Sequence, residues 1–156
     1  MRANLFLAIA LSSLTMNGWA QEVTYRNDIR PMLEARCAKC HGDTAPSLAE
    51  FKLDEEKYRK DKKGPRVDTY EHLLALIAYP DTGAFMRRLD DGGNTPDKKP
   101  GNMYKALGKT DTERSANLKL IKAWVGEGAW NFNRWAKRGD VPAITKAQLD
   151  QLKLKY

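Results

Sequence analysis

The sequence predicts a mostly α-helical fold with long connections. Three stretches, near 27–41, 70–79 and 110–125, place apolar residues at helical spacing and end at or near a glycine or proline. No stretch alternates convincingly between apolar and polar residues, as a half-buried strand would. The first helical stretch ends in "CAKCH", residues 37–41, a pattern that carries chemistry.

The N-terminus has the pattern of an export signal. Arg2 forms a short positive region, Leu5 to Leu14 form an apolar run, and small residues follow at the spacing that a signal peptidase reads. The apolar run is shorter than the roughly 20 residues that a membrane span requires. An uncleaved anchor is the alternative, but no second apolar stretch follows. We expect a signal peptide over 1–20, cleavage after Ala20, and a periplasmic chain of one domain over 21–156.

The first helix is predicted to end at His41. Asn27 or Asp28 can cap its start, and Pro31 fits the first turn, where its missing N–H costs little. Gly42 follows His41 as a natural stop. We expect this helix to bring the cysteines to the core with the apolar face Ile29, Met32, Leu33 and Cys37.

Cys37 and Cys40 are the only cysteines, and three interpretations of them are possible. A zinc site needs two more soft ligands, and the only histidines are His41 and His72. A redox dithiol fits the spacing and an oxidising compartment but gives His41 no role. Covalent haem attachment uses all three side chains, because each thiol bonds a porphyrin vinyl group and the adjacent imidazole reaches the iron. The motif therefore favours one haem c bound by Cys37, Cys40 and His41, with a redox dithiol as the alternative.

The middle of the chain holds a charged connection and two further helical segments. Residues 51–66 contain seven basic and four acidic residues, so we expect a solvated loop or a short exposed helix. A helix from Tyr70 is predicted to end at Pro80, with His72 on its solvated side. Its predicted inward residues are Tyr70, Leu73, Leu74 and Ile77. A helical turn follows with the apolar residues Ala84, Phe85, Met86 and Leu89.

The late helix has both of its ends marked in the sequence. Thr110 and Glu113 form a capping-box pattern, and Gly126 ends the helix after the apolar stripe Leu118, Ile121, Trp124 and Val125. We expect this helix to pack on the first one. Residues 131–156 then form a basic extension with six basic and two acidic residues. Thr145 and Gln148 suggest the cap of a short C-terminal helix carrying Leu149, Leu152 and Leu154, and Trp130 and Trp135 are expected to pack in the core or at the haem edge.

These features resemble a class I, single-haem cytochrome c over about residues 22–130. The resemblance lies in the helix ending "CAKCHG", the late helix "LIKAWVGEGA" and a methionine in the loop before it. The opening "RNDIRPMLEARCAKCHG" is especially similar to exported bacterial members. The resemblance implies a small helical fold around one covalently attached haem, His/Met ligation and one-electron transfer rather than enzymatic catalysis.

Three residues are candidates for the iron's sixth ligand. Met103 lies in a loop flanked by glycine and proline just before the late helix, which is also where the family places its ligand methionine. Met86 lies in an apolar helical turn and is the alternative, although methionine is a common core filler. His72 is the third candidate. We expect His41 and Met103 to bind the iron.

The formal net charge of +7 falls by one unit if residues 1–20 are removed, so the mature chain stays basic. We therefore expect redox protein partners with acidic docking surfaces, no nucleic acid, and membrane contact only through a redox partner. Two alternatives to a carrier remain. One is a haem enzyme or gas-binding protein with an open or labile sixth position, and the other is a dedicated electron-transfer subunit of a larger dehydrogenase or metal-oxidising complex.

Overall fold

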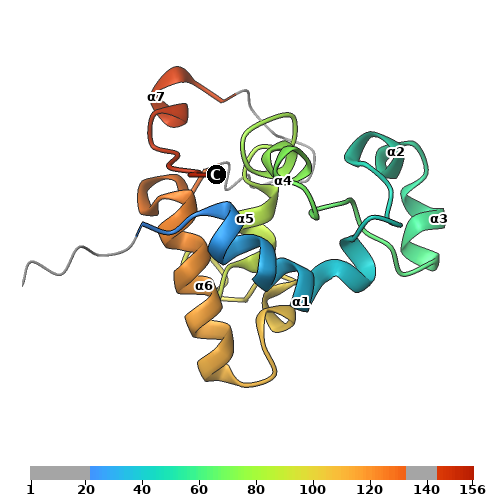
Figure 1. Ribbon diagram of the computed structural model, residues 1–156, viewed down its shortest axis with the longest axis horizontal. Helices are drawn as coiled ribbons and strands as arrows, with labels where there is room; N and C mark the ends of the chain where they lie inside the picture. Colours follow the sequence, from blue (N-terminus) through green and yellow to red (C-terminus); the bar gives the residue numbers. More distant parts are fainter. Residues whose placement is uncertain (1–21, 133–143) are drawn as a thin grey trace, which may run out of the picture.

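The computed structural model describes residues 22–132 and 144–156, and all regular structure within these ranges is helical, as the sequence predicts (Figure 1). None of the helices in the described ranges combines the length and apolarity that crossing a bilayer requires. The α-helices are α1 (Arg30–His41), α2 (Leu48–Leu53), α3 (Glu55–Lys60), α4 (Tyr70–Ile77), α5 (Ala84–Leu89), α6 (Asp111–Val125) and α7 (Lys146–Leu149).

The first helix begins with a π-helical turn, η1 (Tyr25–Ile29), which continues directly into α1. Thr24 caps it, because the Thr24 hydroxyl accepts the N–H of Asn27 at 3.2 Å. The prediction that Asn27 or Asp28 is the cap was therefore wrong, since both already lie inside the helical turn. The helix ends at His41 with Gly42 after it, as expected.

The first and late helices pack on each other, as predicted. The Tyr25 and Trp124 rings lie 6.1 Å apart, and Arg36 on α1 pairs with Glu113 on α6 at 3.3 Å. The capping box of Thr110 and Glu113 is present at the start of α6. The predicted apolar stripe of α6 is entirely buried. The two helices thus form one wall of the core.

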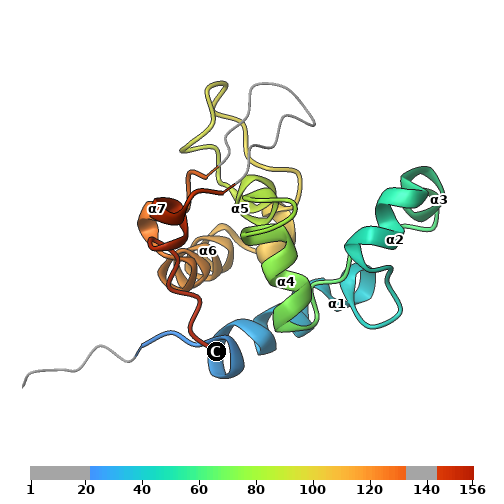
Figure 2. The same cartoon turned by 90° about the horizontal axis from the view of Figure 1, so that it is seen from above.

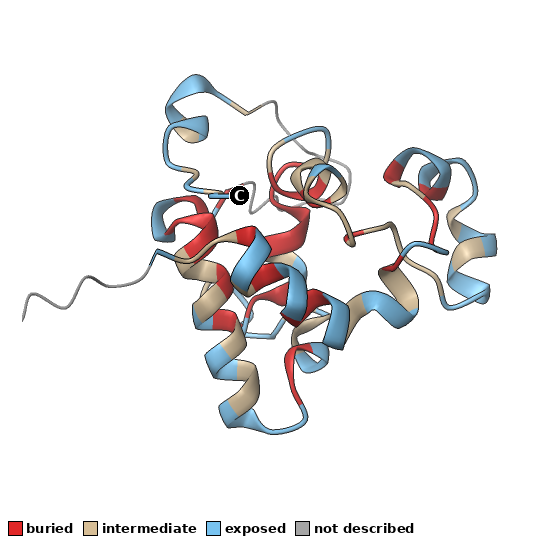
Figure 3. Ribbon diagram, in the orientation of Figure 1, coloured by how far each residue is buried: buried red, intermediate tan, exposed pale blue. Residues whose placement is uncertain are grey.

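Helices α4 and α5 close the other side of this core (Figures 1 and 3). Leu73 and Ile77 are buried as predicted, but Leu76 is the third buried residue of α4, whereas Leu74 is only half-buried. The turn at 84–89 is helical, and all four of its predicted apolar residues are buried.

The charged connection folds into two short helices, α2 and α3, that extend away from the other helices in both views (Figures 1 and 2). Ser47 and Glu50 form a capping box for α2, and the Asp54 carboxylate caps α3. The Phe51 and Tyr58 rings stack at 6.1 Å, which ties the pair together. This connection therefore contains more helix than the single short one expected.

The C-terminal segment packs back on the first helix, beside η1 (Figure 2). The predicted Thr145–Gln148 capping box begins α7, but Leu149 is exposed, whereas Leu152 and Leu154 lie against the core. The Lys155 carbonyl accepts hydrogen bonds from the Tyr25 N–H at 2.7 Å and the Trp124 indole N–H at 2.8 Å. Trp130 is a core residue, and Trp135 lies outside the described residues.

Candidate haem site

The last turn of α1 carries the three residues of the CAKCH motif. Cys37 is half-buried and packs against the core, and Cys40 and His41 follow at the end of the helix. Burial raises the pKa of Cys37 to about 11, and the neighbouring Cys40 acts in the same direction. A redox dithiol works through a thiol that ionises easily. The surroundings of Cys37 therefore disfavour the dithiol alternative.

His41 is oriented by a main-chain group. Its Nδ1 lies 2.7 Å from the carbonyl oxygen of Pro65. A carbonyl oxygen only accepts hydrogen bonds, so Nδ1 carries the proton and Nε2 keeps a lone pair for a metal. Burial lowers the pKa of His41, the hydrogen bond to Pro65 opposes this, and the charge of Arg88 lowers it further. The imidazole is thus held neutral, in the tautomer that an iron ligand needs.

Residues 64–67, which we call the proximal strap, run along the end of α1. The Gly64 N–H donates to the Cys40 carbonyl at 3.0 Å, and the Val67 N–H donates to the His41 carbonyl at 2.9 Å. A Cβ on Gly64 would lie 2.7 Å from His41 Nδ1 and closer still to Cε1. Only glycine therefore lets the strap approach the imidazole this closely. The sequence prediction missed this contact, although the Gly-Pro pair near the end of the charged connection was a signal for it.

Met103 lies directly before the 3₁₀ helix η2 (Tyr104–Leu107), and η2 contacts α1. The Met103 side chain is half-buried against the core, and its N–H donates to the Arg88 carbonyl at 2.9 Å. The charge of Arg88 is close enough to His41 to lower the pKa of the imidazole. The segment around Arg88, which anchors Met103, therefore lies near the end of α1.

The two other candidates have different surroundings. Met86 has no exposed surface and lies within the hydrophobic core. The Nδ1 of His72 lies 2.8 Å from the Thr69 hydroxyl and 3.7 Å from the Asp68 carboxylate, so this ring belongs to the cap of α4. The structure thus places Met86 as a packing residue and His72 as a capping residue.

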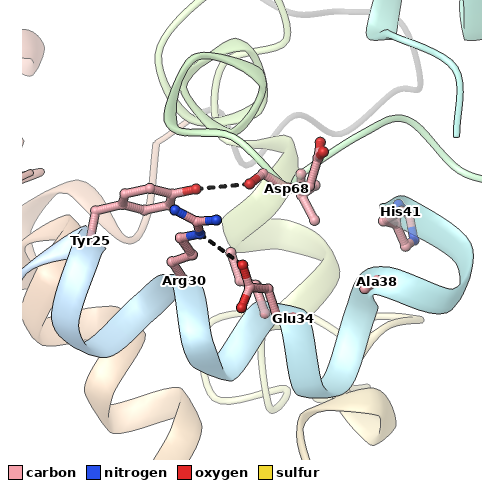
Figure 4. A pocket seen from close by; sticks show the side chains of 8 residues that line it. Tyr25, Arg30, Glu34, Ala38, His41 and Asp68 are labelled. Carbon is pink, nitrogen blue, oxygen red and sulfur yellow. Dashed lines mark hydrogen bonds and ion pairs between the residues drawn. The ribbon is translucent and has the colours of Figure 1, made fainter. Parts of the chain in front are cut away.

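A small pocket lies beside α1 and reaches His41 (Figure 4). Its volume is about 10 Å³, room for about one water molecule. Two polar pairs line it: the Tyr25 hydroxyl donates to the Asp68 carbonyl at 3.0 Å, and Arg30 binds Glu34 at 2.7 Å. The Tyr25 bond ties the first helix to the chain after the strap, whereas Arg30 and Glu34 lie one turn apart on α1 itself.

The residues at the end of α1 fit a covalently bound haem. Two thiols lie on the last turns of one helix, and a neutral imidazole presents a free Nε2. Gly64 in the proximal strap leaves room for this imidazole ring. A helical core built around such a motif defines a monohaem c-type cytochrome.

Comparisons with known proteins agree with this class. The family model described as PccH cytochrome c matches residues 24–156. The solved structure of the monoheme cytochrome PccH from Geobacter sulfurreducens is similar, with 50% sequence identity and a TM-score of 0.74, covering 86% of this chain and 99% of that one. No curated protein matches the chain. The chain belongs to the PccH cytochrome c family and carries one covalently bound haem c. Electron transfer is the role that this family suggests.

Proposed function

We propose that this protein is a one-electron carrier whose haem is attached through Cys37 and Cys40 and whose iron is held by His41 and Met103. The observation that carries the proposal is the hydrogen bond between His41 Nδ1 and the Pro65 carbonyl, which keeps Nε2 free. When bound, the haem supplies a one-electron couple, and a soft thioether ligand favours its reduced form and raises the potential. With His41 and Met103 both bound, the iron would have no position left for a substrate, which separates a carrier from an enzyme.

The surroundings of the two methionines support Met103 as the sixth ligand. Its main chain is anchored to Arg88, whose charge acts on His41, and its side chain is only half-buried. Met86, by contrast, is fully enclosed by other core residues. A thioether must reach an open face to bind iron, and Met103 meets this requirement better.

We also propose export and a single mature domain. The pattern of residues 1–20 supports a signal peptide cleaved after Ala20, and this segment lies outside the described residues. The mature chain, 21–156, would then work in the periplasm. The packing of the C-terminal segment on η1 and α6 supports one domain for the core and its extension.

The partner surface is proposed to surround Met103. The segment on either side of Met103 exposes two aspartates, Asp91 and Asp97, against one arginine and four lysines: Arg88, Lys98, Lys99, Lys105 and Lys109. Basic residues at such a position accelerate encounters with a partner that carries an acidic surface. We therefore propose an acidic redox partner that docks over the Met103 loop.

Methionine substitution tests the ligand proposal. Met103→Ala should remove the weak red sulfur-to-Fe(III) charge-transfer band and lower the reduction potential, because Fe(II) loses its soft ligand. Met86→Ala is the matched control: it should cost roughly 2–5 kcal/mol of stability but keep the band. If the band survives Met103→Ala and disappears in Met86→Ala, the two roles are exchanged.

Exposure of the reduced wild-type protein to carbon monoxide tests the carrier proposal itself. A position filled by a side chain should resist binding, so the visible spectrum should stay unchanged over minutes. Rapid binding would contradict the carrier and favour an enzyme or gas-binding protein with an open or labile site. The Met103→Ala variant is the positive control, because its open position should bind carbon monoxide quickly.

A further inference from the structure

Asp90 is a buried carboxylate at the start of the loop that leads to Met103. Its side chain has no exposed surface, and four N–H donors from the described residues bind its two oxygens. Oδ1 accepts from the Gly92 N–H at 2.8 Å and the Asn94 N–H at 3.3 Å. Oδ2 accepts from the Asn94 side-chain amide at 3.0 Å and the Trp130 indole N–H at 2.8 Å. A carboxylate enclosed in this way is costly to bury unless these bonds stay in place.

The main chain of Asp90 also closes the far end of the same loop. Its carbonyl accepts the Gly101 N–H at 2.8 Å, and the neighbouring bond joins the Met103 N–H to the Arg88 carbonyl at 2.9 Å. A Cβ on Gly101 would collide with the carbonyl groups of Arg87 and Arg88, so this close return requires glycine. The loop from 90 to 101 therefore begins and ends at Asp90, and Met103 lies two residues beyond the closure.

Trp130 connects this loop to the rest of the core. The residue follows the 3₁₀ turn η3 (Glu127–Ala129) at the end of α6, and its side chain is 1% exposed. Its indole N–H donates directly to the Asp90 carboxylate. Asp90 thus joins three parts of the chain: the end of α5, the loop before Met103, and the chain after α6.

We propose that Asp90 is the positioning residue of the sixth ligand and fixes the 90–103 loop so that Met103 stays on the iron. This inference rests on the proposed ligation by Met103. Asp90 itself does not touch the metal and acts through the loop. Removal of residues that orient a metal ligand usually changes affinity or activity by about 10- to 100-fold.

The test is the rate at which imidazole replaces the thioether in the ferric holoprotein. At saturating imidazole this rate equals the rate at which Met103 leaves the iron. Asp90→Asn turns an acceptor into an amide that faces N–H donors, so we expect the rate to rise by about tenfold or more and the charge-transfer band to weaken. Asn94→Ala removes the side-chain amide donor to Oδ2 at a half-buried loop position, keeps the backbone N–H, and should raise the rate in the same direction. This second variant keeps the test valid if Asp90→Asn does not fold.

Tyr70→Phe is the control for a general loss of stability. It removes the hydrogen bond from the Tyr70 hydroxyl to the Leu154 carbonyl, which lies outside the loop. All variants are compared well below their unfolding temperatures. If Asp90→Asn and Asn94→Ala exchange imidazole no faster than Tyr70→Phe, Asp90 only supports the fold and the inference is overturned. If instead Met103→Ala retains the wild-type charge-transfer band, both the ligation proposal and this inference are wrong. That result can be distinguished from an unchanged imidazole exchange rate in the Asp90 and Asn94 variants.

Discussion

Single residues of the haem site are held mainly by main-chain groups of their neighbours. The Pro65 carbonyl orients the His41 ring, and the Arg88 carbonyl anchors the N–H of Met103. Because Gly64 has no side chain, the proximal strap can approach the His41 imidazole closely. The position of the two proposed iron ligands therefore depends on the path of the backbone around them.

Gly64→Ala should disturb the site directly. The added methyl group would overlap the His41 ring, so either the strap or the imidazole must move. We expect a loss of about 1–3 kcal/mol in the free energy of unfolding, as for other overpacked sites, together with a changed visible spectrum. Denaturant titration of the ferric holoprotein measures both quantities.

Gly93→Ala is the matched control for this change. A Cβ at Gly93 would meet only the Asp91 side chain, at 3.0 Å, and both residues are exposed. Its spectrum and stability should stay close to those of the wild type. Equal effects of the two substitutions would contradict the role assigned to Gly64.

The sequence predicted the attachment motif but not the groups that orient it. Two cysteines and a histidine in the CAKCH pattern identify the chemistry by their side chains alone. The carbonyl of Pro65, by contrast, would be present whatever residue stood there. The role of Asp90 was equally hidden, because one aspartate in "LDDGGN" looks the same as another until burial separates them. Ligation of the iron by Met103 remains a proposal.

Among the helices, α6 has the most completely specified ends. The Thr110 hydroxyl accepts the Glu113 N–H at 3.1 Å, and the Glu113 carboxylate accepts the Thr110 and Lys109 N–H groups in return. Glu113 also pairs with Arg36 on α1. The cap thus fixes the start of α6 and its contact with the helix that carries the haem motif.

Thr110→Ala should cost about 1 kcal/mol of stability, within the 0.5–2 kcal/mol typical of lost N-caps. The reason is that the first turn of α6 loses a partner for one of its free N–H groups. Thermal or denaturant unfolding of the holoprotein measures the change. Thr112 is exposed and is the second residue of the same helix, so Thr112→Ala should have a much smaller effect. A comparable loss in both variants would show that composition rather than capping sets the stability of α6.

The accuracy of the helix predictions followed the strength of the local signals. Capping boxes and terminal glycines gave the bounds of α6 and the start of α7 correctly. The start of the first helix was wrong, because a π-helical turn extends it back to Thr24 and no sequence period marks such a turn. Helices α2 and α3 were underestimated because their charged residues show only a short apolar face.

For the whole molecule, the excess of basic residues is the clearest property that the sequence sets. If the lysines and the arginine around Met103 steer an acidic partner, the rate of electron transfer should fall steeply as salt rises. Stopped-flow measurements at increasing ionic strength with the native partner test this. Lys105→Gln should weaken the salt dependence, whereas Lys60→Gln on the distant α3 should leave it unchanged. A rate independent of salt would limit these residues to a role in solubility.

The return of the C-terminal segment to η1 also determines the order in which the molecule can be assembled. Residues 153–155 bind main-chain or side-chain groups of Tyr25, Tyr70, Trp124 and Val125, all of which are synthesised much earlier. Contacts between residues so far apart in sequence form late, because the entropy of closing the long intervening loop must be paid first. The helix that bears both thiols therefore gains its last stabilising contacts only after residues 153–155 have been synthesised. We therefore expect Cys37 and Cys40 to be accessible during that interval, so that haem attachment at these proposed positions would precede the final closure of the fold.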